Sequence, residues 1–384
     1  MRSIRLLLAS CCVFAVSPGG VSAQAVQDTA QIATLLVSRM QLQPGERVLL
    51  VAIPGRSDVL LPVLRRRIAA AGGTDLGVLA ASGEPGASWV TDFTRAVPKD
   101  RTGLATYLST VDLAVIMPGV NAMAPVYPAM QDVLRTGKGR TIHFHWEGAY
   151  ALDGSVLPVT STRGAVYERV LLQTDYAALT AMQAAFERAA RSGSVHVTTP
   201  AGTDLTFMVS DRPVTKQDGD ASAARARAGR NLIDREIELP AGAIRVAPIE
   251  ETVTGQVAFP PGLWSGERVE GLVMRFERGR VTGVAAATGA AAVERELNRA
   301  GEGGRSFREF ALGFNPLLAI PDTGEKWIPY YGYGAGVVRL SLGDNTELGG
   351  RVGGGYVRWN FFTDATVVVG GDTWVRAGKL IKER

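Results

Sequence analysis

Apolar runs of strand length alternate with segments of helical periodicity through the first 150 residues, and this alternation restricts the possible fold more than any other feature. The run RVLLVAI at residues 47–53 is apolar at nearly every position and is bounded by Pro44-Gly45 and Pro54-Gly55, as expected for a strand buried on both faces. Further strands are expected at 76–80, at 113–117 and in the histidine-containing segment 141–148, with helices between them. Strands that alternate with helices form a parallel sheet covered on both faces. The sequence therefore predicts an α/β domain.

The period of the apolar residues changes after residue 192. Residues 163–191 have helical spacing, in one or two pieces, whereas the later chain contains short strands separated by turns rich in Gly, Pro and Asp. We expect an α/β plus mainly antiparallel β protein. The predicted α/β domain with its trailing helices covers residues 26–192, and the predicted β-rich domain covers 193–384.

The N-terminal residues have the pattern of a cleaved secretory signal. Arg2 and Arg5 precede an apolar run at 6–16, and Val21-Ser22-Ala23 supplies small residues for cleavage. We predict a signal peptide at 1–23 and a periplasmic or secreted protein. A lipoprotein cleavage box ending at Cys11 is the alternative. Because Cys11 and Cys12 are the two cysteines of the chain, the mature protein would have no disulfide and no thiolate metal site.

Charge and motifs argue against several classes of function. The net charge of +4 is small for 384 residues, so we expect no nucleic-acid partner. No later segment has the length and apolar content of a transmembrane helix. The turn after the first strand, PGRSD at 54–58, lacks the glycine spacing of a dinucleotide site and the Gly-Lys-Ser/Thr of a P-loop.

One strand carries a possible metal site. In TIHFHWEG, residues 141–148, the side chains of His143, His145 and Glu147 alternate with apolar ones. Alternate residues of a strand share a face, and two imidazoles with a carboxylate are a plausible set of metal ligands. The other interpretation is a strand end whose polar groups are hydrogen-bonded structure.

A series of motifs in the second half resembles a known family. In chain order they are TPAGTDLTF (199–207), LPAGAIRVAP (239–248), FERGRV (276–281), EFALGFNP (309–316) and VRLSLGDN (338–345). Their order and spacing are similar to the aminopeptidase T family of metallopeptidases, the thermophilic leucyl aminopeptidase group. The resemblance covers about residues 195–380. It implies a dimeric exopeptidase fold with two metal ions that polarise the scissile carbonyl and supply a hydroxide.

The resemblance also shows which of the family's metal ligands have changed. The glutamate of the family's PAGE motif falls at Ala243, whereas the glutamate before LGxNP is retained as Glu309. The family's strand histidine falls at Arg339, and its late His-x-Asp pair falls at Arg358 and Asn360. A further family histidine falls near Tyr356. Alanine has no donor atom and arginine is a permanent cation, so neither can bind a metal ion.

Two functional hypotheses follow from these substitutions. In the first, the two-metal peptidase site is lost, no cofactor is needed, and the cleft binds a small anionic or peptide-like ligand. Its expected binding residues are Glu309, Arg339, Arg358, Asn360 and Tyr356, with the arginines pairing with Glu309 or clamping the ligand. In the second, the protein is an active hydrolase with altered ligands or with a divalent metal at His143, His145 and Glu147. A homodimer is implied by the resemblance alone.

Overall fold

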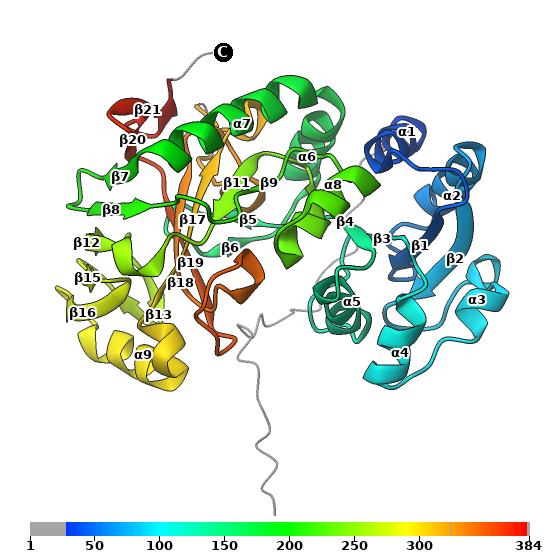
Figure 1. The fold of residues 1–384 in the computed structure, drawn as a ribbon, viewed down its shortest axis with the longest axis horizontal. Helices are drawn as coiled ribbons and strands as arrows, with labels where there is room; N and C mark the ends of the chain where they lie inside the picture. The colour runs from blue at the N-terminus through cyan, green and yellow to red at the C-terminus, as the bar shows by residue number, and fades with distance from the viewer. Residues whose placement is uncertain (1–27, 323, 382–384) are drawn as a thin grey trace, which may run out of the picture.

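The structure is a computed structural model that describes residues 28–322 and 324–381. The predicted signal peptide lies outside the described residues. Figure 1 shows two unlike halves, a parallel sheet with its helices on the right and two antiparallel sheets on the left, with α5 (Val126–Arg135) and α8 (Ala223–Ala228) between them. The predicted α/β plus mainly antiparallel β class is therefore confirmed. Within the described chain, no helix has both the length and the apolar content that a membrane crossing requires.

The parallel sheet has five strands in the order β10-β4-β3-β1-β2. Its strands are β1 (Arg47–Ala52), β2 (Thr74–Ala80), β3 (Leu113–Ile116), β4 (Arg140–Phe144) and β10 (Glu236–Leu239). All four pairings between neighbouring strands are parallel. Strands close to the predicted ranges thus form the expected sheet, and its fifth strand comes from far along the chain.

Helices cover both faces of this sheet because successive residues of its strands point to opposite sides. Val48 and Leu50 of β1 pack with α1 (Thr29–Met40) and α2 (Leu60–Ala70). Leu49 and Val51 pack in a second apolar cluster with α4 (Arg101–Leu108) and α5. The short α3 (Asp92–Arg95) lies beside β2. The continuous apolar run of β1 is explained by this burial on both sides.

The second half contains two antiparallel sheets. One has the order β19-β18-β17-β11-β9, and the other has the order β16-β15-β12-β8-β7-β20-β21-β22. The strands of the first are β9 (Thr215–Lys216), β11 (Ala243–Val246), β17 (Phe307–Gly313), β18 (Val338–Gly343) and β19 (Val357–Phe362). The strands of the second are β7 (Ser194–Thr198), β8 (Asp204–Met208), β12 (Thr254–Ala258), β15 (Val273–Glu277), β16 (Arg280–Ala285), β20 (Thr366–Val369), β21 (Asp372–Arg376) and β22 (Lys379–Leu380).

Three helices and two small hairpins complete the described chain. The helices are α6 (Ser161–Gln173), α7 (Tyr176–Ser192) and α9 (Ala290–Gly304), and the hairpins are β5 (Ala149–Tyr150) with β6 (Val156–Leu157) and β13 (Gly262–Trp264) with β14 (Glu267–Val269). Phe186 of α7 packs against Phe310 and Phe314 beside β17. The apolar face of the β17 sheet therefore forms one core with α7 and the eight-stranded sheet.

The segment from β10 to β11 joins the two halves. β10 is the edge strand of the parallel sheet, and β11 lies in the β17 sheet only four residues later. The buried amide of Gln217 holds the start of this connection, since its Nε2 donates to the Glu236 carbonyl at 2.9 Å and its Oε1 accepts from the Glu238 amide at 2.8 Å. The face of the β17 sheet opposite its apolar face is thereby placed next to β10 of the parallel sheet. The polar residues described below lie between them.

Replacing Ile237 of β10 tests how far this connection stabilises the fold. Ile237 is buried in the main core. We expect Ile237→Ala to lower the free energy of unfolding by about 2–5 kcal/mol, because the lost methyl groups leave a cavity. Chemical denaturation monitored by circular dichroism gives the value, with Val59→Ala, a largely exposed position, as the control. Equal small effects of both variants would contradict a structural role for β10.

Candidate functional site

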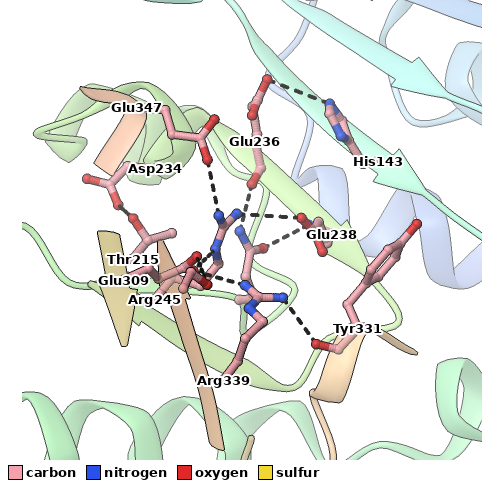
Figure 2. A network of polar contacts seen from close by, with 12 residues as sticks. His143, Thr215, Asp234, Glu236, Glu238, Arg245, Glu309, Tyr331, Arg339 and Glu347 are labelled. Carbon is pink, nitrogen blue, oxygen red and sulfur yellow. Dashed lines mark hydrogen bonds and ion pairs between the residues drawn. The ribbon is translucent and has the colours of Figure 1, made fainter. Parts of the chain in front are cut away.

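Glu309 on β17 is fully buried and is surrounded by three arginines. Arg245 donates from Nε to Oε1 at 2.6 Å, and Arg339 donates from Nη2 to the same oxygen at 2.9 Å. Arg308 donates from Nη1 to Oε2. Figure 2 shows Arg245 and Arg339 converging on Glu309. The predicted pairing of Arg339 with Glu309 is therefore present, and two further arginines join it.

The strand register explains why Arg245 and Arg339 meet. Ala311 of β17 pairs with Arg245 of β11 on one side and with Arg339 of β18 on the other. Residues opposite one another in neighbouring strands point to the same face, and Glu309 is two residues from Ala311 on that face. The three side chains therefore form a compact group on one surface of the sheet.

Arg308 reaches the same carboxylate because β17 contains a β-bulge. The pairing of β17 with β18 shifts between Phe307 and Glu309, so Arg308 is the extra residue. A bulge re-aims a side chain that regular alternation would place on the other face. Arg308 is buried, and its Nε also donates to the carbonyl of Asp344 at 2.6 Å. Neighbouring residues of opposite charge thus share one site.

Two acidic side chains balance the remaining charge of the arginines. Glu347 accepts from Arg245 Nη2 at 3.1 Å and also from Arg308, while a carboxylate oxygen of Glu238 lies 3.9 Å from Arg245 Nη1. Glu309, Glu347 and Glu238 therefore face three guanidinium groups. Burial opposes ionisation of Glu309, but the three arginines outweigh it and hold its pKa well below its usual range. The cluster is a neutral network of ion pairs.

Glu236 lies at the edge of this cluster and, unlike Glu309, is protonated. Burial, reinforced by the charge of Glu347, raises the pKa of Glu236 to about 8. Its Oε1 accepts from Gln131 Nε2 at 3.2 Å and lies 3.9 Å from His143 Nε2. Burial lowers the pKa of His143 well below its usual value. Glu236 and His143 are therefore both uncharged at neutral pH.

The histidine strand is shorter than its alternating pattern predicts. β4 ends at Phe144, so His145 and Glu147 lie beyond it, near the carboxyl end of the sheet. The rings of His143 and His145 are in edge contact, with centroids 5.3 Å apart, and Nδ1 of His145 is buried without a hydrogen-bond partner. Among the described residues, no three His, Cys, Asp or Glu side chains are grouped as metal ligands. The metal site at His143, His145 and Glu147 remains a hypothesis.

The structure does not bring Arg358, Asn360 and Tyr356 to Glu309. In the pairing of β18 with β19, Arg358 and Asn360 lie opposite Leu342 and Leu340, on the face that points away from Arg339. Arg358 stacks over Trp264 at 3.5 Å and donates to Glu296 of α9 at 2.8 Å. Arg358 and Glu309 therefore do not converge, because positions of opposite parity in paired strands occupy opposite faces.

The other two residues on that face also have local partners. Tyr356 donates to Glu296 Oε1 at 2.9 Å, and Asn360 Nδ2 donates to the Leu340 carbonyl at 3.2 Å. Glu296 thus binds both Tyr356 and Arg358. In this structure the late motif YVRWNF packs against α9, whereas Trp359, between Arg358 and Asn360, faces the cluster and lies 4.5 Å from the Arg339 guanidinium.

A strained turn closes the cluster next to Arg339. Tyr330 and Tyr331 have φ angles of 38° and 53° and are followed by Gly332, also in the left-handed region. The Tyr331 carbonyl accepts from Arg339 Nη1 at 3.1 Å, and its amide donates to the Gly148 carbonyl at 2.9 Å. Strained backbone persists where the surroundings fix it and is common at functional sites. This turn connects the end of the histidine segment to the arginine cluster.

The positions inherited from the family do not fit a divalent metal ion. Ala243 has no donor, and Arg245 and Arg339 place two permanent cations against Glu309. A divalent ion there would be repelled by the guanidinium groups at short distance, and it would have to displace them from the carboxylate. The donor chemistry of this site is that of an ion-pair network.

Sequence reasoning missed several members of the cluster. Arg245 shares a strand face with Ala243 in the apolar segment AIRV, and Glu236 and Glu238 alternate with apolar residues in EIEL. A charged residue in an otherwise apolar strand is a usable signal. Arg308 and Glu347 had no such signal, because a bulge and a 3-10 turn at Thr346–Leu348 determine their direction.

Part of the chain matches a known protein family. Residues 170–322 match the family model described as thermophilic metalloprotease (M29). This match confirms, over these residues, the resemblance to the aminopeptidase T family found in the sequence motifs. The match includes Arg245 and Glu309, whereas Arg339 and Arg358 lie beyond it. A search of curated proteins found no match.

Solved structures extend the similarity to nearly the whole chain. AmpT from Thermus thermophilus has a TM-score of 0.59 at 19% sequence identity, and the alignment covers 92% of this chain and 99% of that one. A 2,5-dihydroxypyridine dioxygenase from Pseudomonas putida KT2440 has a TM-score of 0.60 at 17% identity, with 93% and 98% covered. At these identities the likeness establishes the fold, which proteins of different named activities share.

Removal of the Glu309 charge tests the ion-pair network. We expect Glu309→Gln to lower the free energy of unfolding by about 3–5 kcal/mol, because it leaves buried arginines without their common counter-ion. Urea denaturation at neutral pH measures the change. Glu302→Gln, at an exposed pair with Arg280, is the control, with an expected loss of at most about 1 kcal/mol. Similar losses for the two variants would refute the network.

The raised pKa of Glu236 predicts how the free energy of unfolding depends on pH. In the unfolded chain its carboxyl ionises near pH 4.3, whereas in the folded protein its pKa is about 8. Between these values the folded state binds more protons, so the unfolding free energy of the wild type falls as pH rises.

Glu236→Gln removes this titration. Its stability relative to the wild type should therefore increase by roughly 1 kcal/mol for each pH unit from about pH 5 to 8. Denaturation curves of both proteins across this range measure the difference. A difference that does not change with pH would show that Glu236 is already ionised in the folded state.

Proposed function

We propose that this protein is an exported member of the aminopeptidase T fold that has lost two-metal peptidase activity and binds a small anionic or peptide-like ligand in the inherited cleft. One observation carries the proposal. Glu309, the retained ligand position of the family, is engaged by Arg245, Arg308 and Arg339. The arginines supply fixed positive charge where the family holds metal ions, and a guanidinium binds carboxylates bidentately.

Unpartnered polar atoms near the cluster support ligand binding. Nε of Arg339, the hydroxyl of Tyr330 and Nε1 of Trp359 are buried without a hydrogen-bond partner. Buried polar groups normally have partners, and each exception asks for an explanation. A ligand with carboxylate and amide oxygens would supply acceptors for these donors. Peptide-like and anionic compounds have this chemistry.

An active hydrolase is the second candidate, and the contact between His143 and His145 is the observation that favours it. In that case a divalent metal would be held by His143, His145 and Glu147, on the parallel-sheet side of the cluster. The neutral state of both imidazoles, caused by burial, is the state that binds metal ions. Glu238 and Glu147 oppose the loss of the proton from His145.

Metal analysis of the purified mature protein separates the two candidates. We expect substoichiometric transition metal by mass spectrometry, no cleavage of aminoacyl substrates, and an unchanged melting temperature after chelation. About two tightly held metal ions per chain, with peptidase activity that chelation removes, would overturn the proposal. If metal is found, its loss in His143→Ala and His145→Ala, but not in Glu309→Gln, would assign it to the histidine site.

Export and assembly are part of the same proposal. The signal pattern of residues 1–23 supports a periplasmic or secreted location, and the family resemblance supports a homodimer. Mass spectrometry of the protein isolated from the periplasm should show cleavage after Ala23. Light scattering should give the mass of two mature chains, and an uncleaved or monomeric protein would refute the respective part.

A further inference from the structure

A cationic depression lies beside the arginine cluster, on the outer side of Glu347. Its volume is about 330 Å³, and its charged lining consists of Arg135, Arg230, Arg235 and Glu347. These residues come from the end of α5, from the segment around the 3-10 helix at Leu232–Arg235, and from the Thr346–Leu348 turn. Three segments that are distant in sequence therefore build one concave surface.

Two of the arginines in this depression lack a counter-ion. Within the described chain, the guanidinium of Arg230 has no hydrogen bond or ion pair, and its position is exposed. Arg235 is half-buried and donates from Nη1 to the Gly139 carbonyl at 3.0 Å, and no ion pair joins it to a carboxylate among these residues. Arg135, in contrast, is paired with Asp132 at 3.1 Å. Arg230 and Arg235 therefore present uncompensated positive charge.

The carboxylates of Asp234 and Glu347 are engaged by partners other than Arg235 and the Arg230 guanidinium. Asp234 accepts from the Thr215 hydroxyl at 2.7 Å and from the Arg230 amide at 2.8 Å, and it is buried. Glu347 points inward to Arg245 and Arg308. Figure 2 shows Asp234 beside Thr215 and Glu347 beside Arg245. Burial lowers the pKa of Arg235 despite the charge of Asp234, which agrees with a cation short of counter-charge.

We propose that this depression binds a small dianion, with Arg230 and Arg235 as its binding residues. The ligand carries two negatively charged carboxylate groups or one phosphoryl group, since both match two guanidinium forks. This inference deepens the proposed function by assigning the anionic part of the ligand to the outer side of Glu347. Because Glu347 contacts both the depression and the Glu309 cluster, a bound anion lies next to the network that replaces the family's metal ligands.

Calorimetric titration of the full mature protein with inorganic phosphate and, separately, with succinate tests the proposal. We expect binding of at least one anion with a dissociation constant of about 1 mM or tighter at low salt, weakened by added salt. Arg230→Ala and Arg235→Ala should each weaken it by roughly tenfold. Arg235→Lys should restore part of the affinity, because it keeps the charge and loses the fork.

Arg66→Ala, at an exposed arginine of α2, is the matched control and should bind like the wild type. Circular dichroism verifies that each variant is folded. Because Arg230 is exposed, Arg230→Ala should fold normally and gives a clear result even if Arg235→Ala does not fold. Absence of binding of both anions, or equal affinity in wild type and Arg230→Ala, would overturn the proposed site. Anion binding that depends on Arg230 in a protein that also holds two metal ions would preserve this site and refute the loss of the metal centre.

Discussion

The burial of Glu309 among three arginines is the interaction on which the centre of this molecule depends. An isolated carboxylate in this position would be strongly disfavoured, and so would each guanidinium. Their mutual contacts, together with Glu347 and Glu238, make the group electrically neutral. The turn at Tyr330 and Tyr331 is fastened to this group through Arg339. The ion pairs around Glu309 therefore also hold the neighbouring backbone in place.

The architecture explains how these charges come together. The short connection from β10 to β11 carries the chain from the parallel sheet to the β17 sheet, so Glu236 and Glu238 lie at one end of it and Arg245 at the other. The bulge in β17 then adds Arg308 to the face of Glu309. The segment that matches the M29 family model thus contributes Arg245, Arg308 and Glu309 to a buried ion-pair network.

Two groups of buried polar residues with different protonation states lie side by side at this centre. The arginine cluster is held ionised by ion pairing, whereas Glu236 and His143 are held neutral by burial. The difference in protonation between Glu309 and Glu236 follows from their distance to the arginines. Glu309 contacts three guanidinium groups, whereas Glu236 contacts none in the described chain. A ligand that enters beside Glu347 would therefore meet charge on one side and neutral hydrogen-bonding groups on the other.

The sequence by itself determined the fold class, the alternation of strands and helices in the first 150 residues, and the family resemblance. The apolar periods of residues 47–150 are local properties, and the motifs around Glu309 carry the resemblance without knowledge of contacts. The sequence also led to the hypothesis that the family's metal ligands are lost, since arginine and alanine cannot replace histidine and glutamate as donors. Pairing of Arg339 with Glu309 was one of the two arrangements expected for this arginine, the other being a clamp on an anionic ligand.

Only the tertiary structure decided which charged residues meet. Arg358 was expected at the site, but strand parity places it on the opposite face, against Trp264 and Glu296. Arg308 lies in the cluster because of a bulge, and Arg245 because β11 pairs with β17. Register and bulges depend on contacts between strands that are far apart in sequence. Such contacts leave no local pattern, so the residues that hold Glu309 became visible only in the folded chain.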